Sequence, residues 1–152
     1  MLTLRCTQRV RTRLRLPEQL PEAPASTGAL GDWYVHLVRF GRSEFAIATS
    51  ERCLLTLLLP ARALGTSLVP NLHASLRSLL ERLDVPDEQV SRELGAMQPV
   101  SFARATNRRV LGSMNDLAFQ ASHYLAHGGN LATLAERLER AGQSLTTPEV
   151  NP

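Results

Sequence analysis

The pattern of hydrophobic and polar positions predicts four short strands in the first sixty residues. The first covers residues 1–6, and the clearest covers residues 33–40, which are rich in aromatic and branched side chains. Residues 44–49 and 53–59 form two more strands after short turns. The 53–59 run is apolar on both sides, as expected of a central strand. Three consecutive strands joined by short turns predict an antiparallel β-meander.

Helical spacing of apolar residues is the main pattern of the second half. A stripe of leucines over residues 72–83 predicts one helix, with Pro70 near its start, and Pro86 begins a second, short helix. A strand over residues 99–103 comes next. In the N-terminal part, Thr7 caps a further short helix that runs to about residue 16.

The longest predicted helix starts after the capping residue Thr106 and ends at Gly128-Gly129. Its inward positions are spaced by three or four residues: Val110, Met114, Leu117, Ala121 and Leu125. Asn130 caps a last helix. Its inward residues are Leu131, Leu134 and Leu138, and its outward residues are Glu136, Arg137, Glu139 and Arg140.

Together these elements predict one α+β domain over residues 1–142, in which an antiparallel sheet of about four or five strands packs against helices. The helices cluster after the meander and do not alternate with strands, which favours this class over a βαβ arrangement. Residues 17–30 form a Pro-rich loop, and residues 143–152 form a flexible tail.

The amino-acid composition indicates a globular protein without membrane-spanning segments. Hydrophobic residues make up 43% of the 152 residues and charged residues 20%, which is typical of a globular domain. No apolar run reaches the length of a membrane span, and the N-terminus lacks the apolar segment of a signal peptide, so we expect a cytoplasmic protein.

The cysteine pattern argues against zinc. In a reducing compartment Cys6 and Cys53 are expected as buried free thiols, and a disulfide between them is the alternative. No paired-cysteine motif points to zinc, and no sequence motif points to a cofactor, so we expect none.

All 17 basic residues are arginines, and the formal net charge is +3. A guanidinium is a planar fork that binds phosphate or carboxylate through two hydrogen bonds. Five arginines occur close together near the N-terminus: Arg5, Arg9, Arg11, Arg13 and Arg15. On a helix Arg9 and Arg13 share one face, which is either a solvated charged surface or a contact for nucleic-acid phosphates.

Four segments carry a resemblance to a known family: Leu4-Arg5-Cys6-Thr7, Gly31-Asp32-Trp33-Tyr34, the run from Ser50-Glu51-Arg52 to Leu59-Pro60-Ala61, and the run from Thr106-Asn107-Arg108 to Asp116. Over residues 1–127 the chain resembles a family of bacterial proteins known as a domain of unknown function. The resemblance implies a bacterial single-domain protein and carries over no catalytic residue.

The start of the long helix is a candidate anion site. Arg104, Asn107, Arg108 and Arg109 surround a helix N-terminus, whose free N–H groups favour an anion such as phosphate. Asp116 lies further along the same helix. It either anchors an arginine, Arg52 or Arg109, or belongs to a polar site.

The same helix carries a candidate metal pair. His123 and His127 are four residues apart, so both imidazoles can reach one ion, and Asp116 and Gln120 share their face. Two ligands make a weak motif, and the alternative is a solvated face whose histidines lie near the negative end of the helix.

Two hypotheses for the function follow. The first is a non-enzymatic binding or regulatory module whose partner is a nucleic acid, another protein or a second copy of the chain. The second is an enzyme for a phosphate-bearing substrate, in which Arg104, Arg108 and Arg109 hold the anion and Asp116 or His123 acts as acid or base.

Overall fold

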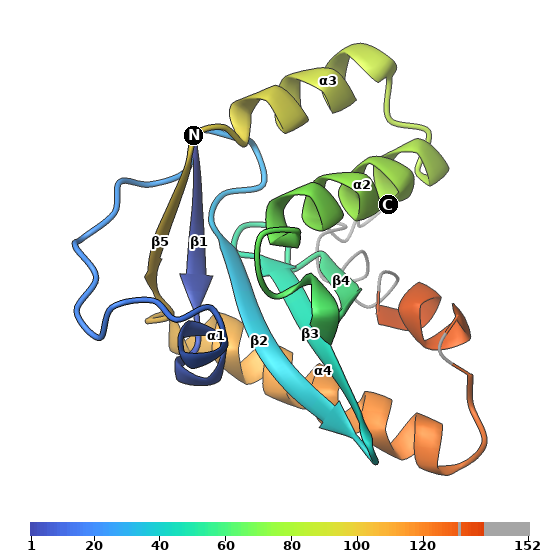
Figure 1. Ribbon diagram of the computed structural model, residues 1–152. Coiled ribbons are helices and arrows are strands. Elements are labelled where there is room, and N and C mark those ends of the chain that lie inside the picture. The colour runs from blue at the N-terminus through green and yellow to red at the C-terminus, as the bar shows by residue number, and fades with distance from the viewer. Residues whose placement is uncertain (131, 139–152) are drawn as a thin grey trace.

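Five strands form a single sheet in the order β4-β3-β2-β1-β5. The computed structural model describes residues 1–130 and 132–138 (Figure 1). The strands are β1 (Leu2–Cys6), β2 (Trp33–Phe40), β3 (Ser43–Ser50), β4 (Thr56–Pro60) and β5 (Val100–Arg104). The helices are α1 (Gln8–Arg13), the short 3-10 helix η1 (Ala61–Ala63), α2 (Leu68–Arg82), α3 (Asp87–Ala96) and α4 (Arg108–Ala126), and residues 132–138 are also helical.

The sheet is mixed, which corrects the prediction of an antiparallel sheet. The β2-β3-β4 meander is antiparallel as predicted. Strand β1, however, lies between β2 and β5 and runs parallel to both, with Cys6 beside Val35 and Arg104. Parallel neighbours require crossover connections, which residues 7–32 and the segment holding α2 and α3 supply.

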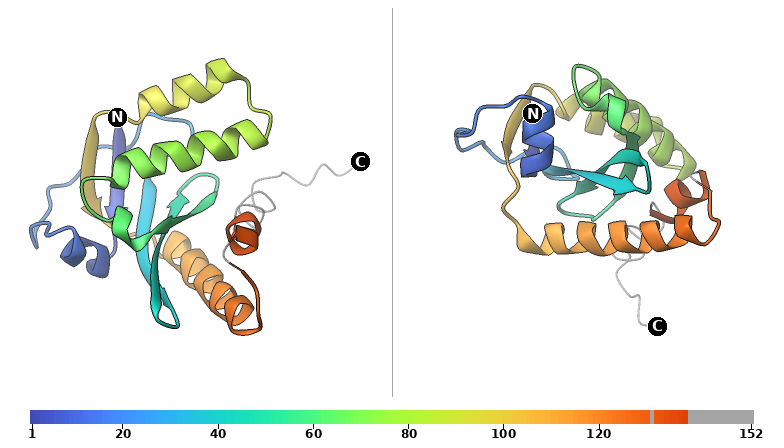
Figure 2. Two further views of the ribbon diagram at one scale, coloured as in Figure 1. Left: turned by 45° about the vertical axis from the view of Figure 1, so that its right-hand side comes forward. Right: turned by 60° about the horizontal axis from the view of Figure 1, so that its bottom comes forward.

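Helices cover both faces of the sheet (Figure 2). On one face, α1, α2 and α3 pack over Leu4, Trp33 and Val35, which are fully buried. On the other face, α4 packs Val110 and Met114 against residues of β2 and β3. Because each strand alternates its side chains between the two faces, the sheet separates two hydrophobic cores.

Strand β4 differs from the sequence prediction in where it begins and in its place in the sheet. Residues 51–53 form a turn, Leu54 has a left-handed φ of 54°, and the strand begins at Thr56. The strand lies at an edge of the sheet and not at its centre. Its run of apolar residues reflects burial on both faces, which an edge strand also has when helices cover both sides of the sheet.

The helices occur where the periodicity predicts them, with differences at their ends. Helix α1 ends at Arg13, and the side chain of Thr7 makes no capping hydrogen bond. Helix α4 is capped by Asn107 and not by Thr106. In the last helix Leu134 and Leu138 are buried as predicted, whereas Leu131, Glu139, Arg140 and the predicted tail at 143–152 lie outside the described residues.

The two cysteines are free thiols, Cys6 buried and Cys53 half-buried. Burial raises the pKa of Cys6 to about 12, so this thiol stays protonated near neutral pH. No helix within the described residues is long and apolar enough to cross a membrane.

Candidate functional site

The carboxyl ends of β1 and β5 lie side by side, with Cys6 paired to Arg104. The chain leaves β1 into α1, whose Val10 joins the core shared with α2 and α3. It leaves β5 into α4, which covers the opposite face. Where neighbouring parallel strands send the chain to opposite faces, a crevice opens at their carboxyl ends, and α/β proteins commonly bind ligands there.

A pocket of about 420 Å³ lies at this position, between α1, residues 16–19 and Arg104, and we call it the β1/β5 pocket. Its polar lining comes from Gln8, Arg11, Thr12, Glu18, Gln19 and Arg104. Arg11 donates a hydrogen bond of 2.6 Å from its guanidinium to the carbonyl oxygen of Cys6, which fixes its position. The side chains of Arg104 and Glu18 have no hydrogen-bond or ion-pair partner within residues 1–130 and 132–138.

A second depression, of about 530 Å³, lies on the other flank of α1 and is lined by Arg9, Arg13 and Arg15. Arg9 donates to the carbonyl oxygen of Leu37 at 3.4 Å. Arg13 pairs with Glu44 at 2.7 Å, and Arg39 holds the second oxygen of that carboxylate at 2.7 Å. The hydrogen bonds from Arg39 and Arg13 hold the pKa of Glu44 below its usual value, so it stays ionised.

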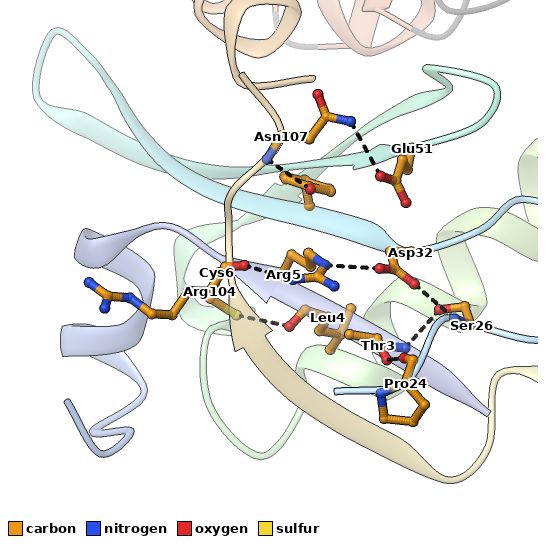
Figure 3. Close-up of polar contacts among 11 residues, drawn as sticks. Thr3, Leu4, Arg5, Cys6, Pro24, Ser26, Asp32, Glu51, Arg104 and Asn107 are labelled. Carbon is orange, nitrogen blue, oxygen red and sulfur yellow. Dashed lines mark hydrogen bonds and ion pairs between the residues drawn. The ribbon is translucent and has the colours of Figure 1, made fainter. Parts of the chain in front are cut away.

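A partly buried ion pair lies on the α4 side of β1 (Figure 3). The Arg5 guanidinium donates from Nε to Asp32 Oδ2 at 2.9 Å, and Asp32 Oδ1 accepts from the backbone N–H of Ser26 at 2.9 Å. Burial alone would raise the pKa of Asp32, but the hydrogen bonds from Arg5 and Ser26 more than offset it, so the pKa is lowered. Arg5 is therefore part of an internal network and does not belong to the exposed basic surface that its sequence position suggests.

Asn107 ties the start of α4 to the turn after β3. Its Oδ1 accepts from the N–H groups of Arg109 (3.0 Å) and Val110 (3.4 Å), and its Nδ2 donates to Glu51 Oε1 at 3.3 Å. Its own N–H donates to the Tyr34 hydroxyl at 3.1 Å. The helix N-terminus predicted to hold an anion thus has two of its amides occupied and a carboxylate beside it.

The four segments that carry the family resemblance meet in these two networks. The first segment supplies Arg5, the second Asp32 and Tyr34, the third Glu51 and the fourth Asn107 (Figure 3). Arg5 also donates to the carbonyl oxygen of Arg104 at 3.2 Å, so the Arg5–Asp32 network adjoins the β1/β5 pocket. This convergence is not visible in the sequence, where its one signal is Arg5, a charged residue in a strand that otherwise carries no charge.

Comparison with protein families agrees with that resemblance. A family model described as a domain of unknown function, DUF6933, matches residues 3–147. The chain belongs to the DUF6933 family. No curated protein and no solved structure matches it.

In this DUF6933 chain the residues proposed for an enzyme do not converge. Arg104 lines the β1/β5 pocket, but Arg108, Arg109, Asp116 and His123 do not. Those four side chains are exposed, and within the described residues they form no ion pair. Asp116 therefore anchors neither Arg52 nor Arg109 there, whereas Asp32, Glu44 and Glu88 each pair with an arginine.

The histidine pair of α4 packs ring against ring. The rings of His123 and His127 have centroids 4.1 Å apart, and His127 Nδ1 is 2.8 Å from the carbonyl oxygen of His123. No group of three or more His, Cys, Asp or Glu side chains suited to a metal ion occurs in the part of the chain that the structure describes. The pair thus brings two ligands at most to an ion.

Two half-buried histidines predict that the DUF6933 domain loses stability on acidification. Burial, together with the charge of Arg9, lowers the pKa of His36, and burial with Arg77 lowers that of His73. As the pH falls, these histidines take up protons in the unfolded chain before they do so in the folded chain. Their contribution to the free energy of unfolding is therefore complete above the unfolded pKa of about 6.5 and is lost as pH falls through the folded pKa values. Urea unfolding at about pH 7.5 and pH 5 measures this loss, and a His36→Gln/His73→Gln variant should show less of it. If the variant loses as much stability at pH 5 as the natural protein does, the two histidines are not the cause of the loss.

Proposed function

We propose that this protein is a cytoplasmic, non-enzymatic binding module for the phosphate backbone of a nucleic-acid strand. The observation that carries the proposal is the pair of arginine-lined depressions on opposite flanks of α1. One contains Arg11 and Arg104, and the other contains Arg9, Arg13 and Arg15. Planar guanidinium groups bind phosphate oxygens through two parallel hydrogen bonds, which makes this surface suited to phosphate.

Several of these arginines are held in position before any ligand binds. Arg9 and Arg11 each donate one hydrogen bond to a backbone carbonyl, and the remaining N–H groups of each stay available. Side chains that are already ordered lose less conformational entropy on binding. Arg15 and Arg104 have no partner within residues 1–130 and 132–138, so no internal ion pair competes with a phosphate there.

The two depressions favour a strand over a single small anion. Gln8 and Thr12 of α1 line both depressions, so the two lie next to each other on either side of these residues. A single phosphate occupies one of them, whereas a strand carries a phosphate at every nucleotide and reaches both. Contacts of this kind read the backbone and not the base sequence.

The test is a fluorescence-anisotropy titration of labelled single strands and duplexes of DNA and RNA at two salt concentrations. With four phosphate contacts, affinity for a single strand should fall about fiftyfold between about 50 mM and 200 mM salt, because bound counterions are released. Absence of binding at the lower salt concentration, or binding that does not depend on salt, would overturn the proposal.

A further inference from the structure

The β1/β5 pocket contains a group that phosphate binding alone does not explain. Glu18 places a carboxylate in the same pocket as Arg11 and Arg104, and it has no partner within the described residues. A free carboxylate repels phosphate and only accepts hydrogen bonds. Its presence therefore points to a ligand that carries hydrogen-bond donors close to its phosphate.

Ribose meets that requirement. Its hydroxyl groups donate hydrogen bonds, and nucleotide-binding sites commonly recognise them through a carboxylate. The pocket volume of about 420 Å³ lies within the range of small-molecule sites. Leu16 and Pro17 add an apolar wall for a sugar or base, and Gln8 and Gln19 add amides that can both donate to and accept from a base edge.

We infer that the β1/β5 pocket binds one ribonucleotide unit, with its phosphate on Arg104 and Arg11 and its ribose hydroxyls on the Glu18 carboxylate. The inference rests on the proposed function and names the ligand of one of its two depressions. Figure 3 shows the Arg104 side chain extending toward α1, so its guanidinium faces the pocket. The unit is either the 5′-phosphorylated end of an RNA strand or a free nucleoside monophosphate.

The consequence is a preference for RNA over DNA, because only ribose carries the 2′-hydroxyl. Anisotropy titrations with a 3′-labelled, 5′-phosphorylated RNA and the DNA of the same sequence measure this preference. One hydrogen bond to a charged group should favour RNA about tenfold in the natural protein. In a Glu18→Gln variant the ratio should fall to about two, because the amide accepts less strongly and the repulsion of phosphate disappears for both strands.

Glu22→Gln is the matched control. Glu22 is an exposed glutamate in the same loop and does not line the pocket, so the variant removes the same charge from the same segment. Its RNA-to-DNA ratio should equal that of the natural protein. Arg104→Gln should remove the advantage of a 5′-phosphate over a 5′-hydroxyl on the same RNA.

The outcomes separate this inference from the proposed function. Equal binding of RNA and DNA by the natural protein, or a ratio that Glu18→Gln leaves unchanged, overturns the ribonucleotide inference and leaves the proposed function standing. Failure to bind either strand overturns both. Displacement of the RNA by adenosine monophosphate, but not by its 2′-deoxy form, supports the inference with a free nucleotide as the ligand. Displacement by 5′-phosphorylated RNA alone supports it with the strand end as the ligand.

Discussion

Replacement of Asp32 by alanine should lower the free energy of unfolding by about 3 kcal/mol, because it leaves the Arg5 guanidinium without its partner inside the fold. The Asp32 side chain is 6% exposed and that of Arg5 21%, so water screens the pair only partly. The variant also removes the carboxylate oxygen that accepts from the Ser26 N–H, and the Ser26 hydroxyl in turn accepts from the Thr3 N–H. The loss therefore extends from β1 to the segment leading into β2.

Denaturant and thermal unfolding measure this effect. A loss of about 3 kcal/mol corresponds to a fall in Tm of about 6–12 °C for a chain of this size. Glu88→Ala is the control, because Glu88 forms an exposed pair with Arg92 at 3.4 Å within one helix, and such pairs contribute little. If the two variants lose the same stability, the Arg5–Asp32 pair is not a stabilising contact.

The pH dependence gives a second readout of the same pair. Because the folded pKa of Asp32 is lowered, its contribution is complete above the unfolded pKa of about 3.9 and is lost as pH falls through the folded pKa. The difference in stability between the natural protein and Asp32→Ala should therefore be full at pH 6 and shrink below about pH 4.

An Arg15→Gln/Arg104→Gln variant should bind single-stranded nucleic acid about a hundredfold more weakly, because each removed charge-assisted contact to phosphate is worth about 1.5 kcal/mol or more. Each of these two arginines lines a different depression beside α1, and their side chains have no internal partner within the described residues. Removing them should leave the stability of the fold unchanged, so the change in affinity reports binding alone.

The matched control removes two arginines that line neither depression. Arg77 lies on α2 and Arg92 on α3, and Figure 1 shows α3 at the far end of β1 from α1. Arg77→Gln/Arg92→Gln has the same net charge as the test variant, so a general effect of charge would weaken both equally. An equal loss of affinity in the two variants would place the binding surface elsewhere.

The sequence by itself determined most of the local structure. Aromatic and branched side chains identified β2 as Trp33–Phe40, and leucine spacing identified the buried face of α2. In α4 the residues predicted to face inward include Val110, Met114 and Leu117, all of which are buried. These properties depend only on the spacing of residues along a strand or a helix, so they can be predicted from the order of residues in the chain.

The tertiary structure decided the sheet order and the candidate site. Parallel pairing of β1 with β2 and β5 joins segments as much as 98 residues apart, and no local pattern encodes it. The Arg5–Asp32 pair spans 27 residues and the Asn107–Glu51 contact 56, so neither polar residue indicates its partner in the sequence. The β1/β5 pocket exists because two neighbouring strands send the chain to opposite faces of the sheet, and that follows only from how the strands pair.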